Sequence, residues 1–97
     1  MDPAIPDIQI SDVVVSTAGR DQGALFYVLN MDETHLMLVN GKDRTLDKPK
    51  RKKRKHVEKV LRSETRVAEK LRSGDKVLNG ELRRDLAFLA RGMQAKT

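Results

Sequence analysis

The chain has 97 residues, no cysteine and a formal net charge of +6. This length allows one domain, since domains commonly have about 100–150 residues, and it leaves little room for the roughly 300–1,000 Å³ pocket of a small-molecule site. The lack of cysteine excludes disulfides and thiolate metal sites. We therefore expect one small domain that is not an enzyme and has no cofactor, metal or small-molecule substrate.

The charge is distributed unevenly. Residues 1–41 carry one basic and six acidic side chains, a net of −5. Residues 42–62 carry eleven basic and three acidic side chains, a net of +8, and residues 63–97 have a net of +3. One strongly positive block beside an acidic half predicts a surface that faces a polyanion.

The N-terminus, MDPAIPDIQI, is acidic and lacks the basic and apolar regions of a secretory signal. No apolar run approaches the roughly 18 residues of a membrane helix. We expect a cytoplasmic protein without membrane contact. Residues 1–7, with two prolines and two aspartates, are expected to form a flexible leader.

Extended segments begin at residue 8. β-Branched residues favour a first strand within 8–15. A loop containing Gly19 and Gly23 leads to a second strand at 25–29. These glycines either allow the backbone to approach a bound polyanion or only supply positive φ in a tight loop.

A third strand at 36–39 ends in Asn40-Gly41, which favours a type I′ turn and an antiparallel return through 44–46. Pro49 ends this return strand or marks a sheet edge. A short fifth strand is expected at 56–58. Five short strands separated by turns predict a small closed β-barrel over residues 8–58.

Residues 59–97 change to a helical period and form a C-terminal extension. Val60, Leu61, Val67 and Leu71 lie among alternating charges and predict a first helix that stops at Gly74. Asn79 is the expected N-cap of a last helix. One apolar stripe of that helix consists of Leu82, Leu86, Leu89 and Met93. The stripe packs either on the barrel or against a partner outside the chain.

The segment from Asp12 to Gly23, DVVVSTAGRDQG, resembles a KOW motif, in which a hydrophobic strand enters a loop that ends at a glycine. The form Ala-Gly-Arg-Asp-x-Gly is closest to the KOW-containing ribosomal proteins of the archaeal and eukaryotic large subunit and their short bacterial relatives. The resemblance continues through Val39-Asn40-Gly41-Lys42 and the segments 46–50 and 55–57, and covers roughly residues 9–58. It implies an SH3-like barrel that binds structured RNA, usually ribosomal.

The run from Lys48 to His56 has seven basic side chains in its first eight residues. These side chains repel one another, so the run gains free energy near phosphates. The alternative is a solvated, flexible tract without nucleic-acid contact. The candidate RNA-binding residues are Arg20, Lys42, Arg44, Lys48, Lys50, Arg51, Lys52, Lys53, Arg54, Lys55 and His56. Arg20 either binds phosphate or pairs with Asp12 or Asp21.

Aromatic residues are scarce. Phe26 and Tyr27 alternate along a strand, so one belongs to the core and at most one can stack on a base. His35 and His56 have no metal-type spacing. The sequence therefore predicts a mainly β protein with an α-helical C-terminal tail that binds the backbone of structured RNA, with a structural or assembly role in translation. The alternative is a KOW protein-interaction module of the transcription–translation machinery.

Overall fold

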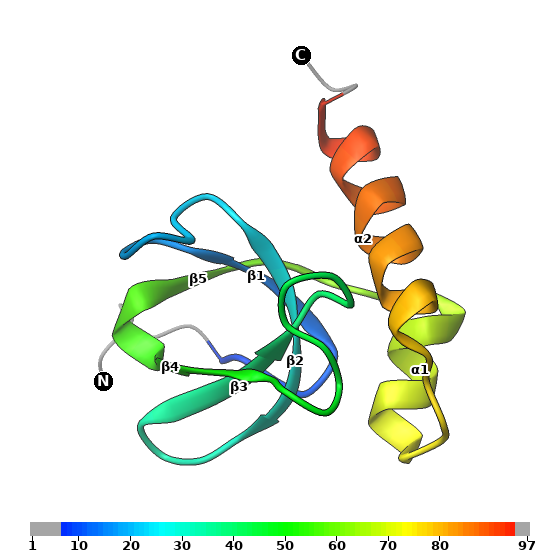
Figure 1. Cartoon of the computed structure of the whole chain (residues 1–97), viewed down its shortest axis with the longest axis horizontal. Coiled ribbons are helices and arrows are strands. Elements are labelled where there is room, and N and C mark those ends of the chain that lie inside the picture. Colours follow the sequence, from blue (N-terminus) through cyan, green and yellow to red (C-terminus); the bar gives the residue numbers. More distant parts are fainter. Residues whose placement is uncertain (1–6, 95–97) are drawn as a thin grey trace.

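The computed structural model describes residues 7–94, so the expected leader lies outside the described residues except for its last position. The strands are β1 (Asp12–Ser16), β2 (Leu25–Met31), β3 (His35–Val39), β4 (Lys50–Lys53) and β5 (Val57–Arg62). A 3₁₀ turn, η1 (Arg54–His56), joins β4 to β5, and the helices α1 (Arg66–Ser73) and α2 (Asn79–Gln94) follow. Figure 1 shows both helices on one side of the strands. The expectation of a mainly β chain with a helical C-terminal part is confirmed.

The five strands form one antiparallel sheet in the order β4-β3-β2-β1-β5. Within residues 7–94, no ladder joins the edge strands β4 and β5. The expected closed barrel is therefore wrong, and the sheet is open. The reason is that η1 turns the chain at the end of β4, after which β5 runs along β1 and does not return beside β4.

The return strand expected directly after Asn40-Gly41 is a loop. A type I′ turn needs positive φ at both central residues, but only Gly41 has it, with φ +77°. The Asn40 side chain instead accepts hydrogen bonds from the backbone N–H groups of Lys42 and Arg44, at 2.9 and 3.0 Å. This wider loop moves the return strand into the basic run, which forms β4 immediately after Pro49.

The fifth strand is longer than expected. Val60 and Leu61, which the sequence placed in a helix, lie in β5, where Leu61 is the partner of Val13 in the ladder with β1. Helix α1 begins only after Thr65, whose hydroxyl accepts a hydrogen bond from a first-turn amide at 3.2 Å. It ends, as expected, at Gly74, with φ +79°. The β unit therefore extends to the end of β5, beyond residue 58.

The sheet has buried side chains on both faces, because Phe26 and Tyr27 point to opposite sides of β2 and are 2% and 0% exposed. One core consists of Ile8, Val14, Phe26, Val28, Leu36, Leu38 and Val57. The other lies between the sheet and the helices and consists of Val13, Tyr27, Val39, Val67, Ala68, Val77, Leu82 and Leu86. The helices are therefore part of the folded unit.

The apolar stripe of α2 packs on its own chain. Leu82 is fully buried and Leu86 is 7% exposed, and Leu89 packs partly against the same core. Met93, one turn further, is half-buried. Of the two alternatives for the stripe, the structure therefore shows packing within the chain, through its three leucines.

Asn79 is not the N-cap of α2. The carbonyl of Leu78 accepts the hydrogen bond from the amide of Leu82, at 3.2 Å, and Glu81 Oε1 accepts from the Leu78 amide, at 3.0 Å. These contacts make Leu78 the capping residue. The Asn79 side chain instead accepts from the Leu46 amide, at 2.9 Å, and ties the loop before β4 to the start of α2.

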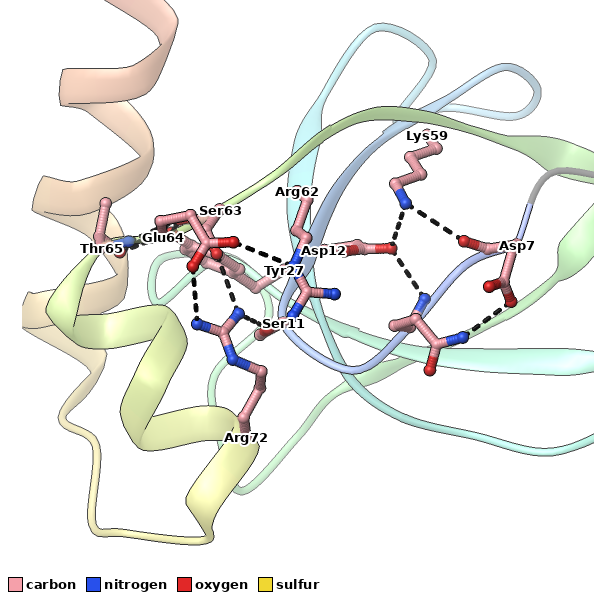
Figure 2. Close-up of polar contacts among 11 residues, drawn as sticks. Asp7, Ser11, Asp12, Tyr27, Lys59, Arg62, Ser63, Glu64, Thr65 and Arg72 are labelled. Carbon is pink, nitrogen blue, oxygen red and sulfur yellow. Dashed lines mark hydrogen bonds and ion pairs between the residues drawn. The ribbon is translucent and has the colours of Figure 1, made fainter.

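Polar contacts join α1 to the sheet (Figure 2). Arg72 Nη1 donates to Ser11 Oγ at 2.8 Å and to the Ser63 carbonyl at 2.9 Å. On the other side of β1, Lys59 Nζ lies 3.1 Å from Oδ2 of the fully buried Asp12.

No helix in residues 7–94 is long and apolar enough to cross a membrane.

Candidate nucleic-acid interface

The middle of the basic run, Lys50–Lys53, forms the edge strand β4, whose side chains alternate between two environments. Arg51 and Lys53 are exposed, Lys50 is half-buried, and Lys52 is only 8% exposed. An edge strand leaves one row of backbone groups unpaired. β4 therefore presents cationic side chains and free backbone donors along one rim of the sheet.

Lys52 faces inward and is bound within the protein. Its ammonium donates to the Ala18 carbonyl at 2.7 Å and to Asp21 Oδ1 at 2.6 Å. Ser16 Oγ donates to the same carboxylate oxygen at 2.7 Å. Burial raises the pKa of Asp21, but the hydrogen bonds from Lys52 and Ser16 outweigh it and leave the pKa below its ordinary value. Lys52 is therefore held within the protein by Ala18 and Asp21, which argues against its place among the candidate phosphate ligands.

The loop between β1 and β2 owes its shape to two glycines in the left-handed region. Gly19 has φ +88° and Gly23 has φ +90°. The Gly23 amide donates to the Ser16 carbonyl at 2.8 Å, which closes the loop. The structural interpretation of these glycines is therefore supported, and the Lys52–Asp21 contact fastens the loop to β4.

A shallow hollow of about 350 Å³ opens beside β4. It is lined by Ala18, Gly19, His35, Lys50, Arg51, Lys52, Lys53 and His56. His35 belongs to it because it is the ladder partner of Lys53. The sequence pattern did not predict that His35 lies beside the basic strand. Only the pairing register of β3 with β4 could have shown it, and the sequence placed the return strand at residues 44–46 instead.

Two cations of the run contact the turn before β3. Arg54 Nε donates to the Asp32 carbonyl at 3.0 Å. Arg51 lies 3.9 Å from the Asp32 carboxylate, and both side chains are largely exposed, so this ion pair contributes little to stability. Lys55 is exposed and His56 is half-buried. The outward-facing part of the run therefore remains accessible to phosphate.

The other candidates lie apart from the end of the run. Lys42 and Lys48 are exposed and Arg44 is half-buried, all in the loop that precedes β4. This loop leads into the first residue of β4, whereas η1 follows its last residue, so the two lie at opposite ends of the strand. The structure thus arranges the cations along the full length of the strand and does not gather them at a point.

Arg20 is exposed at the tip of the β1–β2 loop. Neither of the acidic partners considered for it is bound to it: Asp12 pairs with Lys59 and Asp21 pairs with Lys52. The ion-pair alternative is therefore wrong, and Arg20 stays a candidate phosphate ligand beside Gly19.

The exposed cations suit contact with a polyanion. Within residues 7–94, no three histidine, aspartate or glutamate side chains gather as metal ligands would. The exposed cations extend along a strand, which matches the repeating charge of a nucleic-acid backbone. Comparison of the sequence with protein-family models and with curated proteins finds no match.

Proposed function

We propose that this protein is a cytoplasmic, KOW-type RNA-binding protein that holds structured RNA, ribosomal RNA in particular, by its phosphate backbone. Its role would be structural or related to assembly in translation, without catalysis. The observation that carries the proposal is the sorting of charge on β4 and η1. Arg51, Lys53 and Lys55 face solvent, while the inward Lys52 is neutralised by Asp21.

The chain path supports the KOW and SH3-like assignment. β5 pairs with β1, and a 3₁₀ turn separates β4 from β5, which resembles the SH3-like arrangement. The loop after β1 closes at Gly23, which has the positive φ that explains a glycine at that place in the KOW motif.

The same surface supports recognition of RNA shape and backbone. Phe26 and Tyr27 are both buried, so neither is available for stacking beside the basic strand. Lysine and arginine side chains on a regular strand contact phosphates without reading base identity. Folded RNA, with closely spaced phosphates, is therefore the ligand we expect at β4.

The experiment measures the affinity of the full chain for a structured RNA over a series of salt concentrations. The double variant Arg51→Gln/Lys53→Gln removes two outward cations of β4. A matched control, Arg66→Gln/Lys76→Gln, removes two exposed cations outside β4 and α2. Each lost phosphate contact should reduce the slope of log affinity against log salt by about 1.

We expect the β4 variant to bind RNA more weakly and with a slope smaller by about 2, while the control behaves like the unchanged protein. Circular dichroism would establish that both variants are folded. If the β4 variant and the control show equal affinity and slope, the proposed site is wrong. If the unchanged protein binds no structured RNA, the proposed function itself is wrong.

One observation favours the alternative of a protein-interaction module. A largely apolar hollow of about 510 Å³ lies between the sheet, the loop before β4 and the α1–α2 connection. Its lining residues are Leu29, Asn30, Met37, Leu46, Pro49, Leu71, Gly74, Asp75 and Val77. Such a hollow can accept an apolar side chain of a partner. On this alternative, Met37→Lys would abolish binding of the partner and leave RNA affinity unchanged or slightly increased.

A further inference from the structure

A second cationic surface lies on the outer face of α2. Arg84, Phe88 and Arg91 follow one another at spacings of four and three residues, so they share one face of the helix. All three are exposed, and Phe88 is 63% exposed although it is one of only three aromatic residues in the chain. This face points away from the one that buries Leu82 and Leu86 in the core.

The charges of α2 are sorted by sign. Its two acidic side chains are bound within the protein: Glu81 Oε2 accepts from Lys70 Nζ at 2.9 Å, and Asp85 accepts from Tyr27 and from Thr65. The three arginines, Arg83, Arg84 and Arg91, are all exposed. Within residues 7–94, the one side-chain hydrogen bond of these arginines runs from Arg84 Nε to the Gly80 carbonyl of the same helix, at 3.4 Å. Glu81 attracts Arg84 electrostatically, but in the part of the chain that the structure describes neither carboxylate of α2 forms an ion pair with these arginines, so the outer face keeps a positive charge.

This face is separate from the basic strand. In Figure 1 the last turns of α2, coloured orange to red, extend beyond the strands, while β4 and η1 lie on the opposite side of the view. The molecule measures 36 × 34 × 27 Å. An RNA contact on α2 would therefore involve a different segment from the one bound at β4.

We propose that the Arg84–Phe88–Arg91 face binds an unpaired segment of RNA, with one base stacked on the Phe88 ring and the two guanidinium groups on neighbouring phosphates. Every base has a face that can stack on an aromatic ring, and a guanidinium binds phosphate through paired N–H groups. The inference rests on the proposed function, because it takes RNA as the ligand. It adds a second contact, for unpaired RNA, to a protein whose β4 surface holds the backbone of folded RNA.

RNA is favoured over a protein partner by charge. A protein pocket for Phe88 would need an acidic rim to match the two flanking arginines, whereas an RNA strand supplies a phosphate on each side of every base. The net charge of +6 favours the polyanion at both surfaces.

The experiment uses the full chain and two RNAs: a blunt-ended duplex in which every base is paired, and the same duplex with a short single-stranded extension. Phe88→Ala removes the stacking ring, and Phe88→Leu keeps an apolar side chain without the ring. The matched control is Leu78→Ala, because Leu78 is the other large apolar side chain exposed near α2, at 56%. All these positions are exposed, so the variants should fold, and circular dichroism would verify it.

We expect both Phe88 variants to lose about 5- to 100-fold in affinity for the extended RNA and to bind the blunt-ended duplex unchanged. Leu78→Ala should match the unchanged protein on both RNAs. The double variant Arg84→Gln/Arg91→Gln should lower the salt slope for the extended RNA by about 1–2.

Nuclear magnetic resonance gives a direct view of the stack. The chain has two phenylalanines, and Phe26 is buried, so the Phe88 ring signals can be assigned by comparison with Phe88→Ala. Adding the extended RNA should shift these ring signals upfield, and adding the blunt-ended duplex should not.

The outcomes separate the two proposals. Equal affinity of the unchanged protein and Phe88→Ala for the extended RNA, or an unshifted Phe88 ring, would overturn the inference and leave the proposed function standing. An equal loss for both RNAs would also overturn it, as would a protein partner that needs Phe88 while RNA affinity is unaffected. Failure of the unchanged protein to bind either RNA would overturn the proposed function itself.

Discussion

The phenol of Tyr27, in β2, donates a hydrogen bond to Oδ2 of Asp85, in α2, and so joins the sheet to the last helix. Thr65 Oγ1 donates to the same carboxylate oxygen at 2.8 Å, and Ser63 Oγ lies 2.9 Å from the phenol oxygen. Tyr27 is fully buried. Because a buried polar group without a partner is costly, this cluster selects one position for α2 on the sheet.

The first prediction concerns the ionisation of Tyr27. Burial, and next the hydrogen bond to Asp85, raise the pKa of Tyr27 to about 12. Tyr27 is the only tyrosine in the chain, so the ultraviolet absorbance of tyrosinate reports on it alone. We expect a midpoint well above the value of about 10 found in unfolded chains. A midpoint at the unfolded value in the folded protein would contradict the buried contact with Asp85.

The same shift predicts a pH dependence of stability. The unfolded chain loses the phenol proton at about pH 10, whereas the folded protein retains it up to its higher pKa. The contribution of Tyr27 is therefore complete below pH 10 and is lost as the pH rises toward the folded value. Tyr27→Phe should lower the free energy of unfolding at neutral pH by about 1–3 kcal/mol and reduce its fall above pH 10, as measured by chemical denaturation. Lysines also titrate there, so the difference between the two proteins is the informative quantity.

The second prediction separates two neighbouring lysines. Lys52→Met leaves Asp21 without its cation and should lower the free energy of unfolding by about 2–3 kcal/mol, below the roughly 3–5 of a fully enclosed pair, because the Asp21 side chain is 24% exposed. It should leave the salt dependence of RNA binding nearly unchanged. Lys53→Met should do the reverse. Equal effects of the two variants on RNA binding would mean that Lys52 reaches the RNA.

The change in the free energy of unfolding at acid pH tests the same contact. The pKa of Asp21 is lowered in the folded protein, so the contribution of its ionised form is present above the unfolded value of about 3.9 and is lost as the pH falls through the lower folded value. The stability difference between the unchanged protein and Lys52→Met should therefore be constant from about pH 5 to 8 and shrink below about pH 4. Denaturation at a series of pH values would measure it.

The third prediction compares two glycines with positive φ. At Gly23 a methyl group would meet nothing within 4 Å, whereas at Gly41 it would lie 2.1 Å from the Asn79 carbonyl oxygen. Gly23→Ala should cost only the backbone strain of about 1–2 kcal/mol. Gly41→Ala should cost this strain and a further 1–3 kcal/mol or so from overpacking, because the start of α2 must move. Equal denaturation midpoints for the two variants would contradict the close approach at Gly41.

The fourth prediction concerns the docking of α2. Leu86 is 7% exposed in the core between sheet and helices, so Leu86→Ala should lower the free energy of unfolding by about 2–5 kcal/mol. Leu78→Ala, at a position 56% exposed, should be nearly neutral. Calorimetry or denaturation would compare them.

Truncation after residue 62 tests the same docking. It would uncover Val13, Tyr27 and Val39, which are fully buried under the helices, and we expect the shortened chain to lose its cooperative unfolding transition. A truncated form that unfolds at the same denaturant concentration would show that the two helices contribute nothing to the stability of the sheet.

Local signals in the sequence determined several elements correctly. Gly74 ended α1 in a left-handed conformation, and the spacing of Leu82 and Leu86 identified the buried face of α2. β-Branched residues placed β1, although it begins only at Asp12. These features depend on neighbours within one or two helical turns or on adjacent strand positions, and such neighbours are visible in the chain itself.

Other features depended on contacts between distant segments. Asn79 has the composition of an N-cap, but its side chain binds Leu46, 33 residues away. Val60 and Leu61 fit a helical period, but the ladder with β1 holds them extended. In both cases a tertiary partner outweighed a local preference that is worth about 1 kcal/mol or less.

The basic run shows the division most clearly. Its composition by itself determined that concentrated positive charge lies between residues 48 and 56, and so predicted a polyanion-facing surface there. The pairing register of β4 with β3 sets which lysines face outward. In a sequence, the inward and outward positions of a strand are normally distinguished by the alternation of apolar and polar residues. Seven basic side chains in eight residues carry no such alternation. Only the tertiary structure, by placing Asp21 and the Ala18 carbonyl beneath one position of the strand, decided that Lys52 turns inward while Arg51 and Lys53 face solvent.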